Sequence, residues 1–166
     1  MKTNDVKTKR VHNLIIVDES GSMEVIRKQA FVGMNETLQT VRKMQEKFPD
    51  QEQFVTLLTF DTGHTTWHYD NLPAVQTKDL DWKAYRPGGG TPLYDAIGKG
   101  ISKTNAQIED GDHVLVTIIT DGEEFQQDEA GTKAMFARER RSRERYNCCV
   151  AAEAAMPIGS FFKEEN

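Results

Sequence analysis

Three short polar clusters hold most of the residues in this sequence that could do chemistry. One apolar run leads into residues 18–22 (DESGS), a second leads into 120–122 (TDG), and a glycine-rich segment at 88–90 leads into Thr91. The five candidate side chains are Asp18, Ser20, Ser22, Thr91 and Asp121. They offer two carboxylates and three hydroxyls, and such hard oxygen ligands suit Mg²⁺ or Mn²⁺ better than they suit zinc or copper. The clusters therefore predict a site for a divalent cation.

The low negative charge of this ligand set indicates what the ion would do. If the serine and threonine hydroxyls bind directly, the ion keeps much of its positive charge and attracts a carboxylate from a partner protein. The D-x-S-x-S spacing lets one loop turn three side chains toward one point, and Gly21 permits an unusual backbone angle between the two serines. The residues therefore favour a metal-mediated adhesive contact over a closed structural cage.

Hydrophobic periodicity predicts the strands and helices that position these clusters. Apolar runs typical of buried strands lie at 11–17, 54–60 and 114–119, and the alternating segment 64–69 predicts an edge strand in a hairpin with its predecessor. Apolar residues at three- and four-residue spacing predict helices over 26–48 and 93–108. This alternation of strands and helices is typical of an α/β protein with a mostly parallel sheet. Ligands of such sheets bind outside the carboxyl ends of the strands, so we expect the three clusters to be neighbours in space.

The pattern weakens after residue 128. Residues 134–146 could form a helix with a thin apolar stripe, and 146–152 (YNCCVAA) predicts at best a weak strand. Five arginines lie between 138 and 145, but two glutamates dilute the run and no aromatic residue is interleaved for stacking on bases. We therefore interpret this run as a solvated helix face rather than as an RNA-binding arm.

Length and composition exclude several classes of protein. The chain has 166 residues, which is the length of one domain, and its net charge of -5 argues against a nucleic-acid partner. No stretch approaches the roughly 20 apolar residues that cross a bilayer. The apolar run Leu14–Val17 is too short for the core of a signal peptide, so we expect a cytoplasmic protein. The adjacent Cys148 and Cys149 make neither a disulfide framework nor a four-ligand zinc site.

Together the clusters resemble the metal-ion-dependent adhesion site of von Willebrand factor type A domains. Residues 18–23 (DESGSM) resemble the first loop of that site, 90–96 (GTPLYDA) its threonine loop, and 119–124 (ITDGEE) its aspartate loop. Three matching segments in the right order, two of them at predicted strand ends and one at a predicted helix start, are a specific signal. The resemblance implies a doubly wound α/β fold. Its central sheet would be mostly parallel, with one antiparallel edge strand and helices on both faces.

The resemblance also implies roles for the five residues. Ser20, Ser22 and Thr91 would contact the metal, and Asp18 and Asp121 would bind it directly or through water. The ion would be Mg²⁺, Mn²⁺ or Ca²⁺, and an aspartate or glutamate of a protein partner would complete its coordination, which implies a binding module and not an enzyme. The likeness covers about residues 11–128. We therefore expect an N-terminal extension over 1–10, a core over 11–128, and a divergent C-terminal segment over 129–166 that could complete the same domain.

Other interpretations of the same residues stay open. A metal-dependent hydrolase or phosphatase could use Asp18 and Asp121, although a serine stands two residues after Asp18 and no lysine or histidine is evidently recruited as acid or base. Ser20 and Ser22 could simply cap a helix, and Asp121 could belong to an ordinary turn. A structural subunit that has lost its metal is a further alternative. Outside the clusters, Trp67 and Trp82 are predicted to pack the long loop between them.

Overall fold

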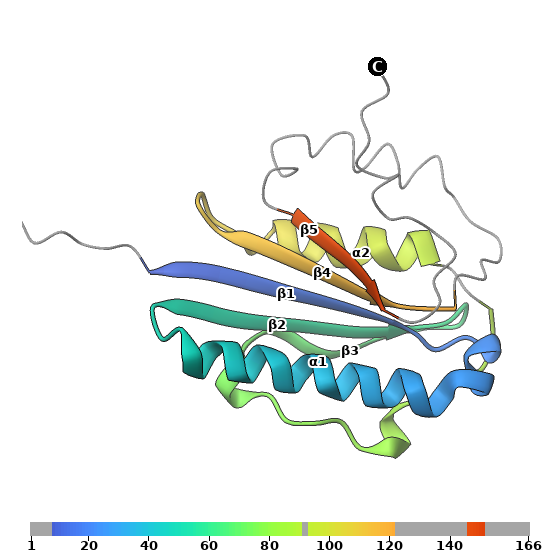
Figure 1. The fold of residues 1–166 in the computed structure, drawn as a ribbon. Coiled ribbons are helices and arrows are strands. Elements are labelled where there is room, and N and C mark those ends of the chain that lie inside the picture. The colour runs from blue at the N-terminus through green and yellow to red at the C-terminus, as the bar shows by residue number, and fades with distance from the viewer. Residues whose placement is uncertain (1–7, 91–92, 122–145, 152–166) are drawn as a thin grey trace, which may run out of the picture.

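A single five-stranded sheet organises the computed structural model, which describes residues 8–90, 93–121 and 146–151. The strands are β1 (Lys9–Asp18), β2 (Gln51–Phe60), β3 (Thr65–Pro73), β4 (His113–Ile119) and β5 (Tyr146–Ala151). They lie in the order β3-β2-β1-β4-β5 (Figure 1). All neighbouring pairs are parallel except β2 and β3, which are antiparallel. The predicted mostly parallel sheet with one antiparallel edge strand is confirmed.

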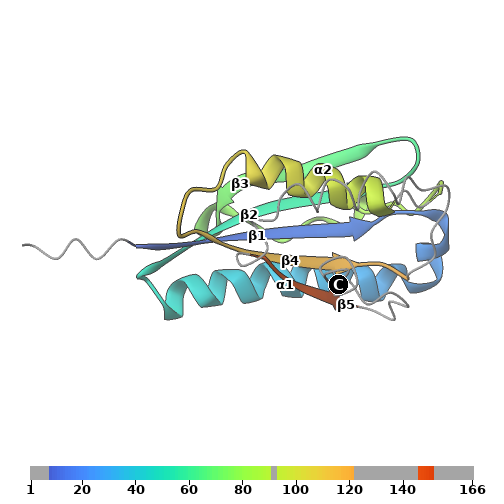
Figure 2. The same ribbon diagram turned by 90° about the horizontal axis from the view of Figure 1, so that it is seen from above.

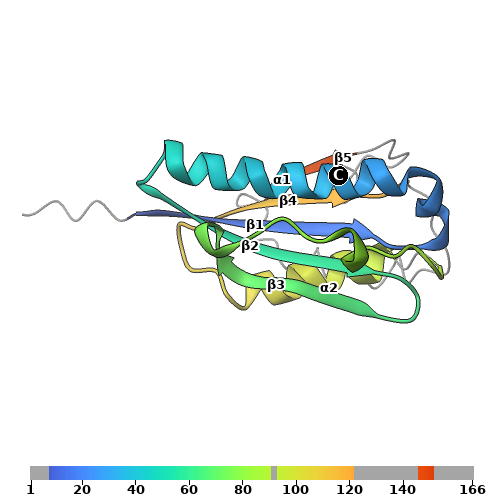
Figure 3. The same ribbon diagram turned by 90° about the horizontal axis from the view of Figure 1, so that it is seen from below.

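Helices cover both faces of the sheet. Helix α1 (Arg27–Lys47) lies on one face and α2 (Leu93–Asn105) on the other, as the two edge-on views show (Figures 2 and 3). Short 3-10 turns occupy Gly21–Ile26, Ala74–Gln76 and Trp82–Ala84. The fold is therefore the doubly wound α/β architecture that the sequence predicts. No helix within the described ranges is long and apolar enough to cross a membrane.

The core consists of two apolar layers that share β1. Successive side chains of a strand point to opposite faces, so Leu14 and Ile16 pack toward α2 while Ile15 and Val17 pack toward α1. All four side chains are fully buried. Burial on both faces explains why this strand reads as one unbroken apolar run in the sequence. It also makes β1 a rigid support for the loop that follows it.

Several boundaries differ from the sequence prediction. Helix α2 ends at Asn105 rather than at 108, and after it the N–H of Gln107 donates to the carbonyl of Thr104, three residues back, which tightens the last turn. Strand β3 continues to Pro73, past the predicted end at 69. Met44, which belongs to the apolar stripe of the helix predicted over 26–48, is 38% exposed and so lies outside the core. The next residue, Gln45, faces the sheet instead, where its side chain bonds to the backbone of Gln51 and Gln53.

The C-terminal part of the chain is described only at β5. This strand matches the weak strand predicted over 146–152 and adds a parallel neighbour to β4. The helix predicted over 134–146 and most of the segment 129–166 lie outside the described residues. The domain boundaries at 10 and 128 stay predictions.

Candidate metal centre

Asp18 is the last residue of β1, and hydrogen bonds fix both of its carboxylate oxygens. The backbone N–H of Ser20 donates to Oδ1 over 2.8 Å, and the hydroxyl of Thr120 donates to Oδ2 over 2.8 Å. Thr120 directly follows β4, which lies beside β1 in the sheet. The side chain of Asp18 is fully buried. The carboxyl ends of two adjacent strands thus hold one carboxylate in a fixed orientation.

The environment of Asp18 disfavours its negative charge. Burial raises the pKa of this carboxyl and outweighs the hydrogen bonds from Ser20 and Thr120, which lower it. The negative charge of Asp121 raises the pKa further. The Ser20 N–H and the Thr120 hydroxyl, which donate to the carboxylate, are both neutral groups. A cation placed here would therefore stabilise a charge that the protein itself stabilises poorly.

The two serines of the first loop lie together beside Asp18. Their Oγ atoms are 3.1 Å apart. Ser20 is buried and extended in backbone conformation, and the 3-10 turn begins at the next residue, Gly21. Neither serine caps a helix with its side chain, because Ser20 makes no side-chain capping bond, Ser22 lies inside the 3-10 turn, and α1 begins after Ile26. Helix capping therefore does not account for the placement of these two hydroxyls.

The glycine-rich segment before Thr91 is bonded directly to the first loop. The N–H of Gly21 donates to the carbonyl of Gly89 over 2.8 Å, and the N–H of Gly88 donates to the carbonyl of Glu19 over 2.9 Å. Gly89 has a φ of 79°, a conformation that glycine adopts without strain. The N–H of Gly90 donates to the Thr62 hydroxyl in the turn between β2 and β3. Gly88 and Gly89 therefore hold the chain against the first loop shortly before Thr91, and Gly90 holds it against the turn between β2 and β3.

Four of the five predicted ligands lie in the described part of the chain. Asp18, Ser20 and Ser22 are gathered at the end of β1, and Asp121 follows Thr120 closely enough for its charge to act on Asp18. Thr91 lies outside the described residues. The sequence predicts that three clusters are neighbours in space, and the structure brings the clusters at 18–22 and 120–122 together at one edge of the sheet. The role of these residues as metal ligands stays a prediction.

Two further residues belong to this frame, and sequence reasoning missed one of them, Tyr85. The hydroxyl of Tyr85 donates to the backbone carbonyl of Asp18, and Glu19 accepts a 2.8 Å bond from the N–H of Arg86 with its side chain. Burial raises the pKa of Tyr85, and the charge of Asp18 adds to this effect, so the phenol stays a donor. Nothing in the sequence around Tyr85 signals this role, because its partner lies 67 residues away.

The donor set suits a hard divalent cation only if hydroxyls take part. In the ranges that the structure covers, no group of three or more His, Cys, Asp or Glu side chains could hold a metal ion. The edge described here brings together two carboxylates and two serine hydroxyls, all of them oxygen donors. Oxygen donors of mixed charge fit Mg²⁺, Mn²⁺ or Ca²⁺.

Comparison with known proteins identifies the fold but no family by sequence. No protein-family model and no curated protein matches the chain. A von Willebrand factor type A structure from Catenulispora acidiphila matches with a TM-score of 0.62 and 16% identity over 86% of this chain. The manganese-loaded TRAP protein of Plasmodium vivax matches with a TM-score of 0.58 and 14% identity over 93%. The pilus adhesin SpaC of Lactobacillus rhamnosus GG matches with a TM-score of 0.56 and 21% identity over 71%.

These similarities establish architecture and not activity. This chain spans 33%, 61% and 15% of the lengths of those three structures. At such identities the likeness shows the fold alone, and that fold is the one of von Willebrand factor type A domains.

Proposed function

We propose that this chain is a protein-binding module that holds a divalent cation with Asp18, Ser20, Ser22, Thr91 and Asp121. The bound ion would supply a positive charge at the carboxyl edge of the sheet, to which an aspartate or glutamate of a partner protein binds. The observation that carries this proposal is the buried Asp18 carboxylate, which neutral donors hold beside the serine pair and near Asp121. Two structural neighbours, a pilus adhesin and a manganese-loaded protein, support it.

Some residues of such a site would orient a ligand, and others would bind the ion themselves. Ser20 N–H and Thr120 orient the Asp18 carboxylate, so little ordering remains to be done when an ion arrives. The serine hydroxyls are neutral ligands, which leave the ion more electrophilic than a set of four carboxylates would. A partner carboxylate is then attracted to the ion rather than repelled by its ligands.

The rival function, a metal-dependent hydrolase or phosphatase, has no observation in its favour in the described part of the chain. The Asp18 carboxylate accepts hydrogen bonds from the Ser20 N–H and the Thr120 hydroxyl, and neither group is a general acid or base near neutral pH. A screen for phosphatase and esterase activity in Mg²⁺ and Mn²⁺ tests this alternative, and we expect no turnover.

Metal binding is tested first by calorimetric titration of the whole chain with Mg²⁺ and Mn²⁺. We expect wild type to bind one ion and Asp18→Asn to bind it at least about tenfold more weakly, since the substitution removes a charged ligand of nearly equal shape. Asp50→Asn is the matched control, because Asp50 is exposed and lies in the turn before β2, at the other end of the sheet. Equal affinity in Asp18→Asn and wild type would remove Asp18 from the site.

Partner binding is tested by capture from lysate with Mg²⁺ present or chelated. Proteins captured by wild type and by Asp50→Asn should be lost on chelation and lost with Asp18→Asn. Capture that survives both treatments would contradict bridging by metal, even if the ion is bound. The cytoplasmic location and the absence of a nucleic-acid partner stay predictions, which the identity of the captured molecules tests.

A further inference from the structure

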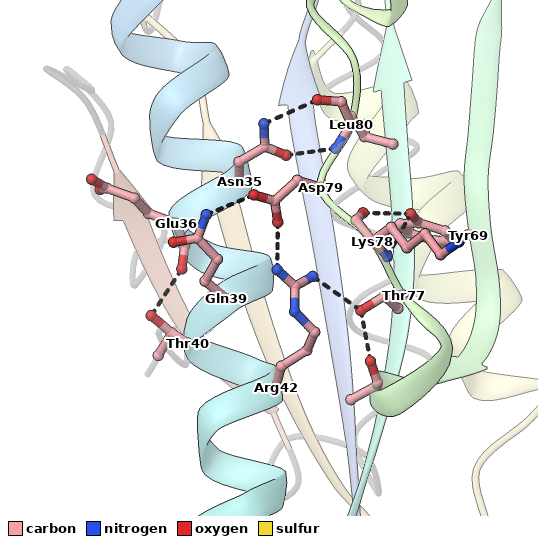
Figure 4. A network of polar contacts seen from close by, with 11 residues as sticks. Asn35, Glu36, Gln39, Thr40, Arg42, Tyr69, Thr77, Lys78, Asp79 and Leu80 are labelled. Carbon is pink, nitrogen blue, oxygen red and sulfur yellow. Dashed lines mark hydrogen bonds and ion pairs between the residues drawn. The ribbon is translucent and has the colours of Figure 1, made fainter.

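Residues 77–90, here called the strap, run along α1 toward the candidate metal centre (Figure 1). Asn35 of α1 holds the middle of the strap with both polar atoms of its side chain. Its Nδ2 donates to the carbonyl of Leu80 over 3.2 Å, and its Oδ1 accepts from the N–H of Leu80 over 2.8 Å (Figure 4). The Asn35 side chain thereby satisfies both backbone polar groups of Leu80 and fixes the strap to the helix.

A charged contact anchors the beginning of the strap to the same helix. Gln39 donates to Oδ2 of Asp79 over 2.7 Å, and Arg42 forms an ion pair with Oδ1 (Figure 4). The pKa of Asp79 lies below its usual value, chiefly because Arg42 donates to it. On the other side, the hydroxyl of Tyr69 donates to the carbonyl of Lys78 over 2.6 Å. Successive turns of α1 thus fix the strap before it reaches the loop 18–22.

The end of the strap joins α1 to Asp18 through Tyr85. Arg27, at the start of α1, donates to the Tyr85 carbonyl from Nε over 3.1 Å and from Nη2 over 2.9 Å. The Arg27 guanidinium also lies 4.1 Å from the centre of the Trp82 ring. Trp82 meets Phe31 edge-on and so packs the strap onto the helix, as predicted for this tryptophan. At its other end, the buried Tyr85 side chain donates to the carbonyl of Asp18.

We propose that Tyr85 is a positioning residue of the metal centre, which fixes the loop 18–22 against α1 by holding the carbonyl of Asp18. Both polar ends of Tyr85 are used, one by Arg27 and one by Asp18. A buried tyrosine hydroxyl needs a hydrogen-bond partner, and here that partner is the backbone carbonyl of a candidate metal ligand. The part of this inference that concerns metal affinity rests on the proposed function.

Hydrogen exchange and metal titration of Tyr85→Phe test this inference together. The substitution removes one hydroxyl and keeps the ring. Without metal, we expect the amides of Ser20 and Gly21 to exchange about fivefold faster, the factor expected for one ordinary hydrogen bond. With metal, we expect affinity for Mn²⁺ to fall about tenfold, as for other residues that orient metal ligands.

Tyr69→Phe is the matched control, because it removes a hydroxyl of β3 that donates to the strap at Lys78, away from the loop 18–22. It should leave exchange at Ser20 and metal affinity at wild-type values. Arg27→Met is a second variant, which removes both donors to the Tyr85 carbonyl and should shift both measurements in the direction of Tyr85→Phe.

The possible results separate this inference from the proposed function. Unchanged exchange at Ser20 and Gly21 in Tyr85→Phe would overturn the positioning role, whether or not metal binds. Faster exchange with unchanged Mn²⁺ affinity would overturn the link from Tyr85 to the metal. If wild type binds no cation while exchange rises in Tyr85→Phe, the loop is positioned as inferred and the proposed function is wrong.

Discussion

Two buried aspartates show how environment separates a candidate metal ligand from a structural carboxylate. Burial acts against the ionised form of both. At Asp112 the N–H of Glu109 and the ring of His12 outweigh burial, with help from Arg10, and the pKa lies below its usual value. At Asp18 the donors are neutral and a second carboxylate is near, so the pKa lies above it. Of these two aspartates, Asp18 is thus the one whose negative charge an added cation would stabilise more.

The contacts of Asp112 predict how stability depends on pH. His12 Nε2 lies 2.9 Å from Oδ2 of Asp112, and the N–H of Glu109 donates to the same oxygen over 3.0 Å. Because folding lowers the pKa of this carboxyl, its contribution is present at neutral pH and is lost as pH falls below about 4. We expect Asp112→Asn to lower the free energy of unfolding at pH 7 by about 1–3 kcal/mol.

Urea unfolding of wild type and Asp112→Asn between pH 7 and pH 2 measures this contribution. The difference between the two proteins should shrink toward the acid end, since protonation removes in wild type the charge that the substitution has already removed. A difference that stays constant or grows in acid would show that the carboxylate charge is not what stabilises this contact.

At the scale of elements, close packing against Thr62 constrains the glycine-rich segment 88–90 in addition to its hydrogen bonds. A Cβ at Gly90 would lie 2.7 Å from Cγ2 of Thr62, whereas a Cβ at Gly88 meets nothing within 4 Å. Thr62 cannot turn away freely, because its hydroxyl accepts from the N–H of Gly90 over 3.1 Å. The turn between β2 and β3 therefore sets how closely the chain before Thr91 approaches.

This crowding predicts that Gly90→Ala weakens Mn²⁺ binding several-fold and lowers stability by about 1–3 kcal/mol, as overpacking does. Gly88→Ala should do neither. Adding Thr62→Ser to Gly90→Ala deletes the clashing methyl and keeps the hydroxyl, so the double variant should recover metal affinity. Calorimetric titration of wild type and the three variants with Mn²⁺ measures the change in affinity. Loss of affinity in Gly88→Ala, or no recovery in the double variant, would show that crowding by Thr62 is not the cause.

The elements that the sequence predicts well are those whose burial leaves a pattern in the chain. Strand β1 is buried on both faces from His12 onward, and β4 is buried on both faces from Val116 onward, although Leu115 before it is exposed. Both strands appear in the sequence as continuous apolar runs. Strand β3 is only half-buried and passes through Asn71 at a φ of 48°, so its alternation fades before its end at Pro73. The strap leaves no periodic signal, because its bonds join side chains of α1 to backbone groups some 45 residues away.

The candidate site was predictable for a similar reason. Its residues follow strands that are easy to recognise, and the parallel topology brings the ends of β1 and β4 to one edge. Tyr85 was not predictable, because only the folded path of the strap brings its hydroxyl to Asp18. Contacts of this kind depend on the tertiary structure and leave no local spacing to read.

At the scale of the whole molecule, the sheet makes one edge out of segments that are distant in sequence. Strand β1 is central, with parallel neighbours on both sides, and its side chains are packed against both helices. The loop that follows β1 therefore begins from a strand that is fixed by neighbours on both sides and by packing on both faces. Because a close-packed interior deforms little, we expect the positions of the candidate ligands to change little when a cation binds.

The most direct test of the central claim is a crystal of the whole chain soaked in Mn²⁺, with anomalous scattering measured at the manganese edge. The account predicts one strong anomalous peak at the carboxyl edge of the sheet, bonded to oxygens of the Asp18, Ser20 and Ser22 side chains directly or through water, with Thr91 and Asp121 around it. A peak elsewhere on the molecule, or none at this edge at saturating Mn²⁺, would contradict the metal centre and the bridging function built on it.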